Sequence, residues 1–147
     1  MESISSAMQR DHVLIDGIAE RAVAAAAAGA WPALEREGGE FLRRLRLHIE
    51  AEEQLLFPAF EQRTGMTAAG PSVQMRAEHG QMQPILAQMQ QAVAARDGAG
   101  YVRASRALLD ILAPHNLKEE QMMYPMLDQA MGTDAQALVA QLRAMAI

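Results

Sequence analysis

The sequence predicts an all-α protein, an up-down-up-down four-helix bundle followed by a short C-terminal helix. Apolar residues make up 50% of the chain but aromatic residues only 4%, and alanine and methionine are abundant. This composition favours helices, because strands are enriched in β-branched and aromatic side chains. Turn residues divide the chain into four long segments, and its two halves repeat each other. We therefore expect one domain, residues 1–147.

The four predicted helices are separated by turns that contain glycine, and the first two turns also contain proline. Ser5 or Ser6 can cap the first helix, and Gly132 ends the fourth. Pro84 and Pro114 fall inside helices, where we expect local kinks. The predicted helices span residues 5–28, 33–63, 72–96 and 100–131, and the short terminal helix spans 134–145.

Charge and composition exclude several classes of protein. The net charge is −5, and the basic cluster Arg43, Arg44 and Arg46 is expected to be a solvated helix face, so no nucleic-acid partner is predicted. No apolar run reaches the ~18 residues of a membrane span, and the N-terminal residues show no signal-peptide pattern. A cytoplasmic location is therefore expected. The absence of cysteine excludes thiolate metal sites and disulfides.

All four histidines obey an internal repeat. A shift of 67 residues places His12 on His79 and His48 on His115. The same shift aligns residues 48–61 with residues 115–128, and the repeated units are about 5–63 and 72–131. Histidines within each unit are 36 residues apart, with midpoints at residues 30 and 97 in the predicted turns. All four are therefore expected at one level of the bundle.

Two of the histidines are followed by a glutamate four residues later, in His48–Glu52 and His115–Glu119. Residues at this spacing share one helix face, so each pair can offer an imidazole and a carboxylate to the same cluster. Imidazole with carboxylate suits iron, zinc or manganese, and two carboxylates can bridge two metals. The predicted metal ligands are His12, His48, Glu52, His79, His115 and Glu119.

Several residues close to these ligands in the sequence are not predicted to bind a metal directly. Glu53 and Glu120 are expected to be solvated or to support the ligands, although Glu120 remains an alternative to Glu119. Asp16 and Gln83 each follow a histidine by four residues and are candidates to point inward. Tyr124 lies nine residues after His115, or about 180° around an α-helix, so no role is assigned to it.

The pattern of a His, an H-x3-E, a second His and a second H-x3-E resembles the hemerythrin-like, or HHE cation-binding, family. The extensions EQLLFP (residues 53–58) and EQMMYP (120–125) resemble the E-x-x-[LM]-[FY]-P extension of that family. The resemblance covers about residues 5–131. It implies a four-helix bundle around two iron ions in a non-haem di-iron centre, bridged by carboxylates and held by the six predicted ligands.

The resemblance also implies candidate functions. Oxygen-carrying members have a further His one turn after the third-helix His, where this chain has Gln83, and an Asp near Glu119. One iron should therefore keep an open position beside Gln83. The four-His, two-Glu set is closer to proteins that repair iron–sulfur clusters after nitrosative stress, which usually carry a Cys-bearing domain.

We expect a di-iron protein that binds O2 or NO for sensing, scavenging or repair. The alternatives are a di-iron oxidase or peroxidase, and a bundle with a structural non-redox metal. The electron donor and any protein partner stay undetermined.

Overall fold

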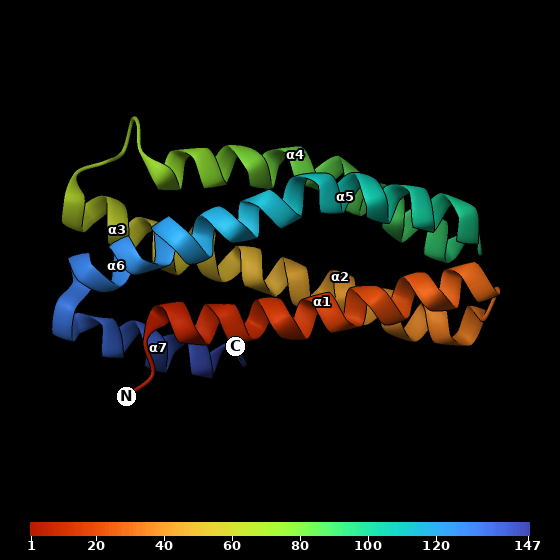
Figure 1. Cartoon of the computed structure of the whole chain (residues 1–147), viewed down its shortest axis with the longest axis horizontal. Coiled ribbons are helices and arrows are strands. Elements are labelled where there is room, and N and C mark those ends of the chain that lie inside the picture. The colour runs from red at the N-terminus through yellow and green to blue at the C-terminus, as the bar shows by residue number, and fades with distance from the viewer.

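A computed structural model describes residues 1–147 as a bundle of four long antiparallel helical segments with no strand (Figure 1). The helices that begin these segments are α1 (Ile4–Ala28), α2 (Trp31–Ala51), α4 (Pro71–Ala94) and α5 (Gly98–Lys118). The predicted fold class is confirmed. No helix combines the length and apolarity needed to cross a bilayer.

The second and fourth segments each contain a π-helical stretch in the same place of the repeat. In the second segment, η1 (Glu52–Leu56) leads into α3 (Phe57–Thr64). In the fourth, η2 (Glu119–Met123) leads into α6 (Tyr124–Met131). A π-helical turn holds one residue more than an α-helical turn, so it rotates every following side chain relative to those before it.

The chain ends in a short 3-10 turn, η3 (Gly132–Asp134), and the helix α7 (Ala135–Ala144). Its Leu138 and Leu142 are buried among residues of α1, α3 and α6. The N-terminus of α1 lies at the same end of the bundle, where Asp128 of α6 accepts hydrogen bonds from the backbone N–H groups of Ile4 and Ser5 (2.9 and 3.0 Å).

Helix boundaries differ from the predicted ones by a few residues. Ser3, rather than Ser5 or Ser6, caps α1, and it forms a reciprocal capping box with Ser6. Gly29 closes α1 in the left-handed conformation (φ 65°), as its place in the turn predicts. Helices α4 and α5 continue through Pro84 and Pro114 without a break in helical structure.

Two apolar clusters fill the bundle and leave a polar layer between them. One cluster, which includes Phe41, Leu86 and Leu108, occupies the half nearer the α1–α2 and α4–α5 turns. The other occupies the half with α3, α6 and α7, and includes Met8, Phe60 and Leu127. The four histidines lie along their helices between residues of the first cluster and residues of the second.

Gly98, at the start of α5, is expected to tolerate no side chain. A Cβ built there would lie 2.4 Å from the carbonyl oxygen of Ala26, which is backbone and cannot swing aside. We expect Gly98→Ala to lower the free energy of unfolding by about 1–3 kcal/mol through overpacking. Gly80 of α4 is the matched control, because nothing lies within 4 Å of its Cβ position.

The alanine at Gly80 should stabilise the protein by about 0.4–1 kcal/mol. Urea denaturation of both variants, with the metal state held constant, measures the two effects. Equal stability of Gly98→Ala and the unchanged protein would contradict the close approach of the α4–α5 turn to α1.

Candidate metal centre

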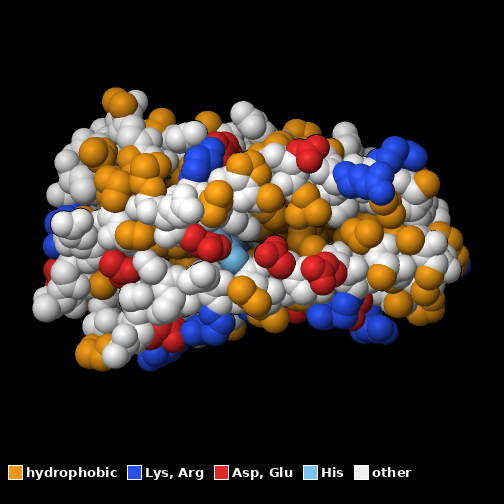
Figure 2. Space-filling view, in the orientation of Figure 1, with side chains coloured by type: hydrophobic (Ala, Val, Ile, Leu, Met, Phe, Trp, Pro, Cys, Tyr) orange, Lys and Arg blue, Asp and Glu red, His pale blue; other side chains and the backbone are white.

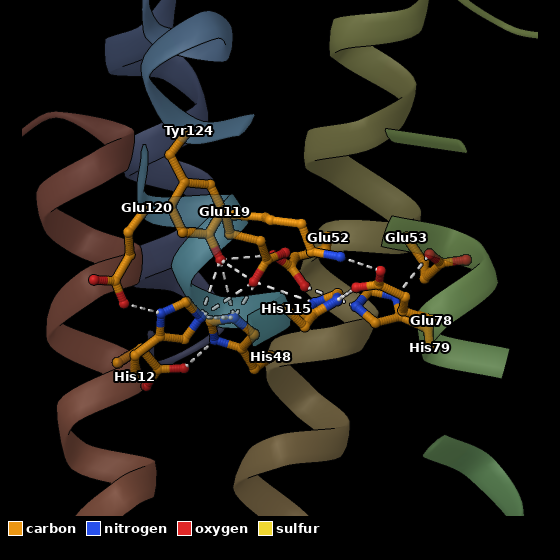
Figure 3. Close-up of polar contacts among 12 residues, drawn as sticks. His12, His48, Glu52, Glu53, Glu78, His79, His115, Glu119, Glu120 and Tyr124 are labelled. Carbon is orange, nitrogen blue, oxygen red and sulfur yellow. Dashed lines mark hydrogen bonds and ion pairs between the residues drawn. The ribbon is translucent and has the colours of Figure 1, made fainter. Parts of the chain in front are cut away.

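The structure brings all six predicted ligands together in the polar layer (Figure 3). The four histidines are 1–3% exposed, and Glu52 and Glu119 are fully buried. The Nε2 atoms of His12 and His48 lie 3.1 Å apart. Ligand atoms within 4.8 Å of one another form two groups, one of Glu52, His79, His115 and Glu119 and the other of His12, His48 and Glu119.

The histidines form two pairs, His12 with His48 and His79 with His115. The two buried glutamates lie between these pairs. Glu119 Oε1 is 3.2 Å from His12 Nε2 and 3.3 Å from His115 Nε2. Glu52 Oε1 is 3.1 Å from His79 Nε2, and its Oε2 is 3.7 Å from His48 Nε2. Each carboxylate therefore touches one histidine of each pair, which is the placement that bridging two metals requires.

A second carboxylate holds the Nδ1 atom of every histidine. Glu120 lies 2.7 Å from His12, Asp11 2.7 Å from His48, Glu53 2.9 Å from His79 and Glu78 2.8 Å from His115. A carboxylate on Nδ1 fixes the ring's orientation and tautomer and leaves Nε2 free to bind a metal. All four Nε2 atoms point to the centre of the layer, so the imidazoles are set up as ligands.

These outer carboxylates obey the 67-residue repeat, since Asp11 corresponds to Glu78 and Glu53 to Glu120. Glu53 and Glu120 each contact the Nδ1 atom of a histidine, so the structure favours a supporting role for both over a solvated one. Glu119, not Glu120, lies among the inner ligand atoms. Sequence reasoning missed Asp11 and Glu78. The available signal was the acidic residue directly before the first His of each unit, and each of these acids reaches the histidine of the neighbouring helix.

Three of the outer carboxylates also contact a basic side chain. Asp11 pairs with Arg44 (2.8 Å), Glu53 with Arg76 (3.1 Å) and Glu78 with Lys118. Glu120 has no basic partner and lies beside a groove between α1 and α5. His12 is therefore the histidine whose supporting carboxylate has no cation beside it.

Unpaired polar atoms indicate that the layer fits a metal. Five buried side-chain N or O atoms lack a hydrogen bond of normal geometry, and three of them lie in this layer. They are Glu119 Oε2, and Glu52 Oε1 and His79 Nε2, which face each other at 3.1 Å without such a bond. An unpaired buried polar atom is costly, so such atoms normally have a partner. Their clustering among nitrogen and oxygen donors fits cations bound between them.

Burial and the neighbouring carboxylates shift the pKa values of histidines in the layer. Burial lowers the pKa of His12, but hydrogen bonding to Glu119 and the charge of that carboxylate outweigh it and raise the pKa to about 9. Burial also lowers the pKa of His79, but the Glu52 carboxylate, 3.1 Å from its Nε2, outweighs burial and raises the pKa to about 9. Burial, and then the charge of Glu119, raises the pKa of Glu52.

We expect the metal-free protein to lose stability as the pH rises. A histidine whose pKa is raised from 6.5 to about 9 stabilises the fold fully below pH 6.5, and this contribution disappears as the pH rises towards 9. Metal affinity should increase over the same window, because protons no longer compete for Nε2. Urea midpoints of chelated protein at pH 6.5 and 9 measure the first effect, and metal competition titrations measure the second. A midpoint that increases with pH would contradict these assignments.

Tyr124 lies inside the layer, so the prediction that it faces away from His115 was wrong. Its hydroxyl is 2.7 Å from Glu52 Oε2 and 2.9 Å from Glu119 Oε1. The cause is η2, whose extra residue turns Tyr124 back by about 100° relative to an uninterrupted α-helix. Burial, and then the negative charges of Glu119 and Glu52, raise the pKa of Tyr124 well above its usual value.

Gln83 and Asp16 are exposed, so the expectation that they point inward was also wrong. The buried stripe of α4 runs through Met75, His79, Met82 and Leu86, and Gln83 lies one helical step beyond it. The structure therefore does not support an open metal position beside Gln83.

The groove between α1 and α5 adjoins the layer at Glu120. Its volume is about 640 Å³, and it is lined by apolar side chains that include Val23, Leu109 and Leu117. Asp16, Glu20 and Glu120 add carboxylates to this lining. Figure 2 shows a histidine side chain among acidic side chains in the middle of this face of the molecule.

Comparison with known families gives one match. The model described as "Hemerythrin HHE cation binding domain" matches residues 3–127, which include all six inner ligands and all four outer carboxylates. The match thus spans both repeated units. No curated protein and no solved structure gave a significant match.

Proposed function

Since the chain belongs to the hemerythrin HHE cation-binding family, we propose that its six converging ligands hold two iron ions and that this non-haem di-iron centre binds O2 or NO. The observation that carries the proposal is the pair of buried glutamates, each in contact with one histidine of each pair. Two imidazoles with carboxylate oxygens, and no thiolate, are the ligands of non-haem iron sites with open positions.

The surroundings of the layer suit a small, weakly polar ligand. Apolar clusters close it above and below, and such a shell limits the access of water to a bound metal. The groove between α1 and α5 is lined mostly by apolar side chains and includes Glu120, which contacts His12, so it brings a small apolar molecule to the edge of the layer. Sensing, scavenging and supply of iron for cluster repair are the uses that such binding would serve.

A di-iron oxidase or peroxidase is the second candidate, and the position of Tyr124 favours it. A phenol in contact with both bridging carboxylates can deliver a proton and an electron to a substrate bound at the metals. Steady consumption of peroxide or NO, in the presence of an electron donor, would separate this enzyme from a binding protein.

An anaerobic metal count with optical spectra tests the proposal. Protein produced with iron is expected to contain two iron ions per chain, and the spectrum of the reduced form should change on adding O2 or NO. A reproducible count of one, or replacement of iron by zinc in iron-supplied protein, would overturn the di-iron assignment. An iron-loaded protein whose spectrum changes with neither O2 nor NO would contradict the proposal that the centre binds these gases.

A further inference from the structure

The two halves of the polar layer differ in the aromatic residue that follows each π-helical stretch. The 67-residue shift that relates the six ligands and the four outer carboxylates also places Tyr124 on Phe57. Both residues directly follow a π-helical stretch and are fully buried. Phe57 stacks on the ring of His79, with 5.7 Å between ring centroids, and offers no donor atom. Tyr124 brings a hydroxyl to the other half.

The hydroxyl of Tyr124 lies among ligand atoms and has no other partner. It is 3.2 Å from His12 Nε2 and 3.2 Å from His48 Nε2, in addition to its contacts with Glu52 and Glu119 (Figure 3). Two donors bound to one metal at about 2.1 Å, and at right angles, lie about 3 Å apart. The phenol oxygen is therefore at ligand-to-ligand distance from four other donor atoms.

We propose that Tyr124 is an additional ligand of the metal held by His12 and His48, and that the exchangeable position for O2 or NO is on the metal held by His79 and His115. This assignment rests on the proposed di-iron function. The phenol proton leaves to solvent as the oxygen binds, and the phenolate is a hard, anionic donor that suits ferric iron. Phe57 leaves the corresponding position of the second metal without a protein donor.

The first test is the visible spectrum of the oxidised, iron-loaded protein. Phenolate bound to ferric iron gives a charge-transfer band, and Raman excitation within that band enhances the vibrations of the tyrosine ring. We expect both signals in the unchanged protein and their loss in Tyr124→Phe at an unchanged count of two irons. Tyr101→Phe is the matched control, because Tyr101 is also buried but lies in the apolar cluster away from the ligands.

The second test counts the molecules of NO that the reduced centre takes up. The unchanged protein should bind one NO per chain, and Tyr124→Phe should bind two, because the metal held by His12 and His48 gains an open position. Phe57→Tyr should show the reverse, with a stronger charge-transfer band and weaker NO binding. Circular dichroism confirms that each variant is folded.

The outcomes distinguish this assignment from the proposed function. A protein with two irons that reacts with NO but lacks the phenolate band would overturn only the assignment of Tyr124 as a ligand. Tyr124 would then act only through its hydrogen bonds to Glu52 and Glu119. Equal NO uptake by the unchanged protein and Tyr124→Phe would overturn the position of the open site. A protein that takes up no iron would overturn both.

Discussion

Chelation of the bound cations is expected to lower the melting temperature by at least about 8 °C per site. A ligand present at about 1,000 times its Kd stabilises the folded state by about 4 kcal/mol, and 1 kcal/mol moves the melting temperature of a domain of this size by about 2–4 °C. The effect should be large here because Glu52 Oε1, His79 Nε2 and Glu119 Oε2 are buried and make no hydrogen bond of normal geometry within the protein.

Scanning calorimetry of the loaded and the chelated protein, followed by reloading, measures this effect. Reloading is the control, because recovery of the original melting temperature shows that the chelator did not damage the fold. An identical melting curve with and without metal would contradict binding by these buried groups.

Glu119→Ala should weaken metal binding more than any change to the outer carboxylates. Glu119 belongs to both groups of ligands and contacts a histidine of each pair. Loss of an outer carboxylate typically costs 10–100-fold in metal affinity. We therefore expect a loss of more than about 100-fold for Glu119→Ala, a metal count below two and no spectrum of a bridged centre.

Glu120→Ala is the matched control, because it removes the neighbouring carboxylate that contacts only the outer nitrogen of His12. It should keep two metals with affinity reduced by about 10–100-fold. Metal analysis and competition titrations compare the two variants. If Glu120→Ala proved the more damaging change, the fourth-helix ligand would be Glu120 and the inward position of Glu119 would be wrong. Glu52→Ala and Glu53→Ala repeat the comparison in the other half of the site.

The level of the four histidines could be predicted from the sequence because it depends on counting residues between turns. An α-helix rises by a constant amount per residue, so equal distances from two turns bring His12 and His48 to one level, and the same holds for His79 and His115. The shared face of His48 and Glu52 is a local property of one helix, and the structure keeps it.

The contacts of the outer carboxylates could not be predicted by counting residues along the chain. Asp11 precedes His12, but its side chain reaches His48 on the neighbouring helix. Adjacent residues on a helix point in different directions, so this contact depends on how α1 and α2 are rotated about their axes. That rotation results from packing of the whole bundle, which no spacing within one helix specifies.

The directions of the Tyr124 and Gln83 side chains also could not be predicted from residue spacing. The sequence determined the fold class, the repeat and the six residues that converge, because these follow from local periodicity and from the positions of turns. Only the tertiary structure decided which side chains complete the layer. The π-helical turn at Glu119–Met123 brings Tyr124 inward against the α-helical count, and packing along Met75, Met82 and Leu86 leaves Gln83 in solvent. Each outcome depends on about 100° of rotation around a helix axis, and one residue inserted into a turn changes the direction of a side chain by that amount.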